Sequence, residues 1–184
     1  GTTLYIAGQQ RMPDGLWGGE LTTINLASAV TSPSTAVTGQ YSISDGHHSK
    51  LLFADDNTLW IGSQLCANGE RAKLAAAGNT TQAANYNCLT RFDLGANTAQ
   101  IVPTITPNGS TTVSYPNTNQ NLYYYGDLTG LCWVQGFHKG YTAYGGQVHA
   151  FNTVDGSDIN NQYITVQGTA LDVAYLDAIA DTDN

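Results

Sequence analysis

Apolar and polar positions alternate in short segments along most of the chain, as they do in strands that have one buried face. A segment that ends in small residues occurs three times, and each copy is followed by a loop, a second strand that closes on a turn, and a third short strand. The first strands are Leu4–Gly8, Leu59–Ser63 and Tyr141–Gly145; the second are Leu21–Leu26, Leu89–Leu94 and Val148–Thr153; the third are Ala36–Gly39, Ala99–Val102 and Tyr163–Val166. The repeat predicts meanders of antiparallel strands.

A fourth strand completes the repeating unit. Lys50–Asp56 precedes the second copy, and Ala170–Asp177 follows the third. Four-stranded meanders that repeat along a chain are the blades of β-propellers, so we expect an all-β, β-propeller-like fold with about three blades. The predicted organisation is a single β-propeller-like domain or a propeller fragment over 1–184, with repeat units at about 1–44, 45–103 and 122–168 and a closing strand at 169–177.

The segments between these strands contain turn residues and little periodicity. The longest are 9–20, 67–87 and 103–121, which we interpret as surface insertions. Only 70–77, which is rich in Ala and Lys, has a composition that supports a helical turn, and all other structured segments are predicted to be β.

The strands near the two ends of the sequence raise a hypothesis about pairing. Leu4–Gly8 and Ala170–Asp177 are able to share one sheet, which would close the arrangement. If they do not pair, their free edges invite a strand from a partner, so self-association is a second hypothesis.

Several short motifs carry a family resemblance: Asp45–Lys50, Leu59–Ser63, Cys66, Cys88–Thr90 and Gly145–Phe151. Together they resemble the secreted bacterial β-propellers related to YVTN-repeat proteins, over most of the chain from Leu4 to Asp177. The resemblance implies a propeller fold and carries little information on activity. Because closed propellers have about four to eight blades, the resemblance also implies that this chain is part of a larger ring or assembly.

The three cysteines bear on the compartment. Cys66 and Cys88 bracket an insertion between two strands that should be neighbours, so we predict a disulfide between them in an oxidising compartment, with a contribution of about 3 kcal/mol. The alternative is three buried free thiols, which is our interpretation for Cys132. Abundant Asn, Thr, Ser, Gly and Tyr with little Lys and Glu is typical of secreted, periplasmic or cell-surface β-proteins, so we expect an extracytoplasmic location.

Charge and hydropathy exclude two classes of partner. The 184 residues carry 14 acidic and six basic side chains, a formal net charge of −8. The basic residues are scattered, whereas nucleic-acid binders cluster them, so no nucleic-acid partner is expected. No apolar run approaches the roughly 20 residues of a membrane-spanning helix, so no membrane span is expected.

Two polar clusters are candidates for metal binding. Asp45, His47 and His48 combine imidazole and carboxylate donors in one loop, although adjacent residues of a strand point to opposite faces. The alternative is a structural loop. Asp155–Asp158 has the oxygen-rich spacing of a calcium loop but is also an ordinary Asp-Gly turn, which is the interpretation we favour. The roles of His138 and His149 stay open.

Aromatic side chains are dense in one part of the sequence. They are candidates for platforms that bind a protein or glycan at the cell surface, and the alternative is packing between sheets. No nucleophile elbow, phosphate-binding glycine loop or metalloprotease helix is present. We therefore predict a non-catalytic binding or assembly module without a resident cofactor. The alternatives are a metal-dependent or lactonase-like hydrolase and a self-assembling filament or surface-layer subunit. The candidate binding residues are Tyr123, Tyr124, Tyr125, Trp133, Tyr141 and Tyr144.

Overall fold

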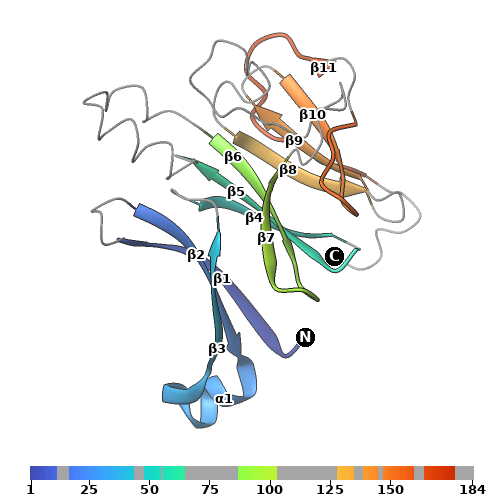
Figure 1. Ribbon diagram of the computed structural model, residues 1–184. Coiled ribbons are helices and arrows are strands. Elements are labelled where there is room, and N and C mark those ends of the chain that lie inside the picture. Colours follow the sequence, from blue (N-terminus) through green and yellow to red (C-terminus); the bar gives the residue numbers. More distant parts are fainter. Residues whose placement is uncertain are drawn as a thin grey trace.

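Three antiparallel β-sheets, stacked one on the next, make up the fold in the computed structural model (Figure 1). The structure describes residues 1–11, 17–43, 48–54, 56–64, 87–102, 128–134, 139–144, 147–159 and 164–176. Within these ranges the chain is all-β apart from two short helical segments, as the alternating pattern predicted.

Each sheet is a meander in which neighbouring strands follow one another in the chain. The first sheet contains β1 (Thr3–Arg11), β2 (Trp17–Asn25) and β3 (Val37–Ile43). The second contains β4 (His48–Ala54), β5 (Thr58–Gln64), β6 (Asn87–Asp93) and β7 (Thr98–Val102). The third contains β8 (Leu128–Val134), β9 (Lys139–Tyr144), β10 (Gln147–Asn152) and β11 (Ile164–Thr165).

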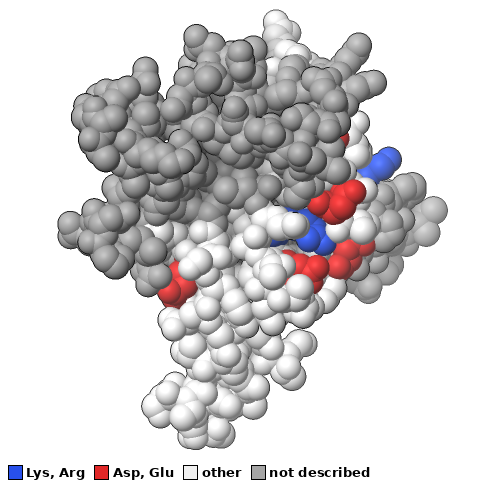
Figure 2. Space-filling model, in the orientation of Figure 1, with Lys and Arg blue, Asp and Glu red and all other residues white. Residues whose placement is uncertain are grey.

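Two helical segments lie where the sequence predicted only β-structure. Leu26 was expected to end a strand but begins α1 (Leu26–Thr31), and the 3-10 helix η1 (Pro33–Thr35) follows. The cause is local, because the side chain of Asn25 accepts a hydrogen bond from the Ser28 N–H at 2.9 Å and so caps α1. Figure 2 shows a surface without charged side chains over α1, at the lower end of the first sheet.

The predicted closing strand at 169–177 is wrong for the described residues 169–176, which form no strand. Residues 170–176, which we call the strap, lie against β8, where the Thr129 hydroxyl donates a hydrogen bond to the Ala170 carbonyl at 2.6 Å. A Cβ on Gly130 would lie 2.5 Å from the Val173 nitrogen, so only glycine lets the strap approach this closely. The strap therefore does not pair with β1, as the ring-closure hypothesis required.

The hydrophobic core lies on both faces of the second sheet. Strand β5 shows why, because its side chains alternate between the two faces. Leu59 and Ile61 are fully buried against the first sheet, and Trp60 is buried against the third. One cluster comprises Leu21, Ile43, Leu59, Ile61 and Phe92, with Tyr5, Ala7 and Tyr41 among the residues packed against it; the other comprises Ala54, Trp60, Leu89, Val102 and Phe151, with Leu52, Leu131 and Trp133 packed against it.

A buried arginine joins the second sheet to the third. The Arg91 Nε donates to the Thr153 carbonyl at 2.9 Å, and Nη2 donates to the Val154 carbonyl at 2.6 Å. The Thr153 hydroxyl in turn donates to the Asp56 carboxylate. These bonds satisfy a guanidinium that would otherwise be costly to bury, and they hold the turn after β10 against β6.

The same register recurs in all three sheets and locates each face. Leu4 pairs with Ile24, Leu59 with Phe92, and Gly140 with Phe151. The second member of each pair is the penultimate residue of its strand, so the first members occupy equivalent positions. Gly140, rather than Tyr141, is thus the counterpart of Leu4 and Leu59. The third copy of the repeated phrase is offset by one residue from its alignment in the sequence, and Tyr141 is the counterpart of Trp60.

Replacing the buried indole tests the stacking of the second and third sheets. Trp60 is almost fully buried, its ring centroid lies 6.0 Å from that of Phe151, and its Nε1 donates to the Thr58 hydroxyl at 3.0 Å. We expect Trp60→Ala to lower the free energy of unfolding by about 3–5 kcal/mol in urea denaturation, because it leaves a cavity between two sheets. The control Phe53→Ala, at a half-exposed aromatic residue, should cost less than half as much. Equal losses would contradict this account of the core.

Candidate functional site

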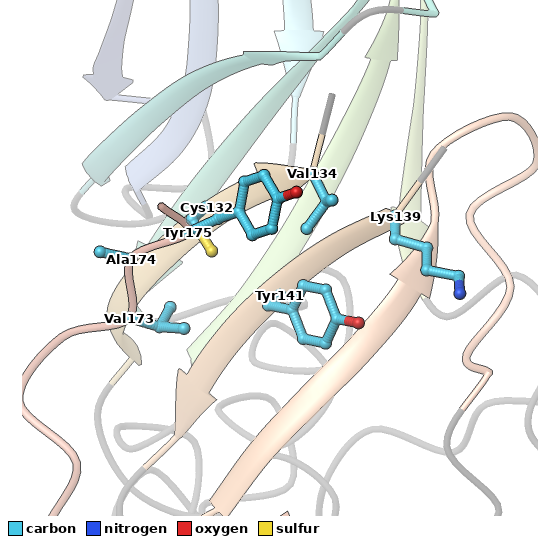
Figure 3. A pocket seen from close by; sticks show the side chains of 7 residues that line it. All are labelled: Cys132, Val134, Lys139, Tyr141, Val173, Ala174 and Tyr175. Carbon is cyan, nitrogen blue, oxygen red and sulfur yellow. The ribbon is translucent and has the colours of Figure 1, made fainter. Parts of the chain in front are cut away.

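A cavity of about 380 Å³ lies between the strap and the face of the third sheet that points away from the second (Figure 3). Its walls come from three segments of the chain. Cys132 and Val134 belong to β8, Lys139 and Tyr141 to β9, and Val173, Ala174 and Tyr175 to the strap. We call this space the strap cavity.

Strand alternation and register place the sheet residues on one face. Cys132 is paired with Tyr141, and Val134 with Lys139, so the four side chains project from the same side of β8 and β9. The intervening Trp133 projects from the opposite side and packs against the core between the second and third sheets. The close approach of the strap at Gly130 then covers part of this face and supplies the third wall of the strap cavity.

The walls of the strap cavity are mainly apolar, with a small number of polar groups. Figure 3 shows the rings of Tyr141 and Tyr175 on either side of the space, one from β9 and one from the strap. The lining residues also carry polar groups, namely the ammonium of the exposed Lys139, which extends away from Cys132 and Tyr175 in Figure 3, the two tyrosine hydroxyls and the Cys132 thiol. Such a cavity suits an apolar group that carries a negative charge, because Lys139 supplies the cation and a tyrosine hydroxyl supplies a hydrogen-bond donor.

Cys132 is a free thiol, as the sequence analysis expected, and it is half-buried. Burial, and secondarily the negative charge of Asp172, raise the pKa of this thiol. The thiolate is the nucleophilic form of cysteine, so a raised pKa keeps Cys132 in the unreactive form at neutral pH. The residues of the strap cavity are therefore suited to binding, and Cys132 contributes to it as a small apolar side chain.

The structure separates the predicted aromatic residues. Tyr141 lines the strap cavity, whereas Trp133 lies on the other face of the same sheet. Tyr144 ends β9, and only its backbone is described. The predicted residues Tyr123, Tyr124 and Tyr125 lie outside the described residues.

The metal and disulfide hypotheses concern residues that the structure does not describe in full. Asp45, His47 and Cys66 lie outside the described residues. His48 begins β4 and Cys88 lies in β6, each with only its backbone described. Both hypotheses stay predictions. In the ranges that are described, no three His, Cys, Asp or Glu side chains gather in a metal-binding group.

The turn at Asp155–Asp158 has the hairpin geometry that we favoured over a calcium loop. Gly156 has a positive φ of 76°, and its N–H donates to the Asn152 carbonyl at 2.8 Å. The Asp155 carboxylate accepts the Ser157 N–H at 2.9 Å. Asp158 points the other way, into the protein, where its Oδ2 lies 3.8 Å from Nδ1 of the fully buried His149. The carboxylates thus serve the turn and the core.

Sequence reasoning found Tyr141 but missed the rest of the strap cavity. The signal for its sheet side was available, because Lys139 and Tyr141 are two residues apart in a strand and must share a face. The strap side had no such signal. Its alternating pattern predicted a strand in a sheet, and its actual position depends on Gly130, which lies far earlier in the chain.

Comparison with known proteins finds no family model and no curated protein that matches this chain. Among the described residues, no helix has the length and apolar character needed to cross a membrane.

The reactivity of Cys132 tests its environment. We expect iodoacetamide to modify Cys132 at pH 8 at least severalfold more slowly than a solvent-exposed thiol, with the rate rising as the pH increases. Peptide mass spectrometry after timed quenching separates this signal from Cys66 and Cys88. Asp172→Asn should speed the reaction, because removing a negative charge lowers the pKa of the thiol. Asp155→Asn, in an exposed turn, should have no effect. Modification as fast as that of an exposed thiol would show that the strap does not cover Cys132.

Proposed function

We propose that this chain is a non-catalytic binding module of an extracytoplasmic protein, and that the strap cavity holds a small apolar group bearing a carboxylate. The observation that carries the proposal is the strap cavity itself, an apolar space of about 380 Å³ with one cation, Lys139, among its lining residues. Ligand sites in proteins commonly have volumes of about 300–1,000 Å³ and combine apolar walls with a few polar groups that orient the ligand.

The chemistry of the walls favours one class of partner over another. Two tyrosine rings and aliphatic side chains accommodate an aromatic or branched aliphatic group, and the Lys139 ammonium pairs with an anion. Neutral, hydroxyl-rich glycans match these walls poorly. The sequence left a protein and a glycan open as partners, and the cavity favours a protein. The group it would bind is an apolar side chain next to a carboxylate, and a small molecule with the same two features would bind in the same way.

The sheet makes this a rigid site. Tyr141 and Lys139 belong to β9, which is paired on both sides by β8 and β10. Their backbone is held by the core that packs behind the same sheet, around Phe151 and Trp60. A preorganised wall loses little conformational entropy on binding, so modest contacts suffice for measurable affinity.

The fold supports the wider assignment. Three stacked meanders, with strands at most of the positions where the repeat predicted them, are consistent with a propeller-like arrangement and with the resemblance to YVTN-repeat proteins. The polar, lysine-poor composition supports an extracytoplasmic location. A rigid scaffold with a binding cavity at one end of the stack is consistent with the propeller-like arrangement and with the extracytoplasmic location.

The binding proposal predicts which ligands and variants matter. Titration of the protein with 3-phenylpropionate and with indole-3-acetate, followed by amide chemical shifts in NMR, should perturb β9 and the strap. Tyr141→Ala should weaken binding about tenfold or more, because it removes one wall. Lys139→Met, which keeps the aliphatic stem, should weaken binding by up to about fivefold, the effect expected of an exposed ion pair.

Two controls accompany this titration. Lys50→Met removes a positive charge from β4, away from the strap cavity, and should leave binding unchanged. The neutral amides of the same two acids should bind as weakly to the parent protein as the acids bind to Lys139→Met. Absence of any shift in β9 and the strap at millimolar ligand would rule out the proposed site.

A further inference from the structure

Among the described residues, the first sheet has one strand fewer than the other two, and the difference falls at a definite position. The shared register makes β1 the counterpart of β5 and β9, which are second strands of their sheets. In those sheets, β4 lies beside β5 and β8 lies beside β9. No strand occupies the equivalent place beside β1 in the part of the chain that the structure describes. One edge of the nine-residue strand β1 is therefore free of a strand partner within that part.

The face of the first sheet that points away from the second sheet is apolar at its centre. Leu4 and Ile6 project from it and are 45% and 43% exposed. Their counterparts Leu59 and Ile61 are fully buried, because the first sheet packs against them. The exposed face of the first sheet is thus equivalent to the face of the second sheet that the first sheet covers.

The edge of β1 lacks the features that usually prevent strand addition. Residues 3–10 contain no charged residue and no proline, and the strand is long. Exposed edges of this kind act as templates for another strand. Together with Leu4 and Ile6, β1 therefore offers both backbone hydrogen-bonding groups and apolar side chains to a partner.

The strap has the matching features. It follows the last strand of the third sheet in the chain, as β4 follows β3 and β8 follows β7. In the chain order it occupies the place of the first strand of a following sheet. It belongs to no sheet in the described structure, and its Leu171 and Leu176 are 79% and 78% exposed. Its own β1 is out of reach of direct pairing, because the strap lies on the third sheet and the second sheet stands between that sheet and the first.

We infer that the partner of β1 is a second copy of this chain: the strap of one copy adds to the free edge of β1 in the next. The added strand gives the first sheet the four strands of the other two. The Leu4 and Ile6 face of that sheet then packs on the face of the donor's third sheet that carries Tyr141, the counterpart of Trp60. This contact repeats the packing already present between successive sheets within one copy. The interface is head-to-tail, so copies assemble into a closed ring or an open filament.

The strap cannot line the cavity and pair with β1 of another copy at the same time. Ligand in the strap cavity should therefore oppose assembly, and assembly should weaken ligand binding, by linkage. If the NMR titration detects no ligand while assembly occurs, the proposed function fails and the present inference stands.

Sedimentation velocity of the full chain over a range of concentrations provides the first test. We expect species larger than a dimer to accumulate as the concentration rises. Ile6→Lys should raise the concentration for half-assembly about tenfold or more, because it places a charge at the acceptor strand. The control Val30→Lys introduces the same charge in place of a branched aliphatic residue on α1, where Val30 is 84% exposed, and should assemble like the parent.

Mixing two defective variants provides the decisive test. Deletion of 170–184 removes the donor, and its folding is checked by circular dichroism; Ala174→Pro is a second donor variant that removes one strap N–H. At the concentration for half-assembly of the parent chain, each defective variant alone should stay largely monomeric. Ile6→Lys, which keeps its strap, should form a one-to-one complex with a donor-defective variant, which keeps its β1, and the complex should grow no further. A parent chain that stays monomeric at all concentrations, assembly that Ile6→Lys leaves unchanged, or a mixture without a heterodimer would each overturn the inference.

Discussion

Burial of the second sheet on both faces is the constraint on which the rest of the structure depends. In β5, Leu59 and Ile61 need one apolar partner surface and Trp60 needs another. A single sheet cannot satisfy both, so the first and third sheets must pack on opposite sides. Arg91 adds specificity to one of these interfaces, since its guanidinium is satisfied by carbonyls from the turn after β10. The order of the stack follows from these contacts.

The strap cavity is a consequence of the same stack. Tyr141 occupies the position that Trp60 has in the second sheet, and in each case the aromatic ring points toward the next layer. The layer next to Trp60 is the complete third sheet, and its Phe151 and Trp133 fill the space. The layer above Tyr141 is one extended segment, which covers the face only in part. The strap cavity is the space that a full sheet would have filled, which is why its walls are apolar like a core.

The sequence predicted most of the strands because the signal for a strand is local, but β8 (Leu128–Val134) was not among the predicted strands. The β10 turn was also predictable, since Asp155 and Gly156 favour a hairpin on their own. The strand prediction failed at Leu26, because the side chain of Asn25 caps a helix that begins there. It also failed at the third repeat, where Gly140 shifts the phrase by one residue. A shift of one residue exchanges the two faces of a strand, so only the observed pairing reveals that Tyr141 points outward.

By itself, the sequence determined most of the strand positions, the order in which those strands pair as meanders, and the alternation that gives each strand two distinct faces. These properties depend on neighbours a few positions apart, and a single chain carries that information directly. Only the tertiary structure decided which face meets which sheet, that the strap lies on Gly130 instead of pairing as a strand, and that a cavity remains beside Tyr141. Those outcomes depend on packing between residues that are distant in the chain, such as Arg91 and Thr153, and no local pattern specifies them.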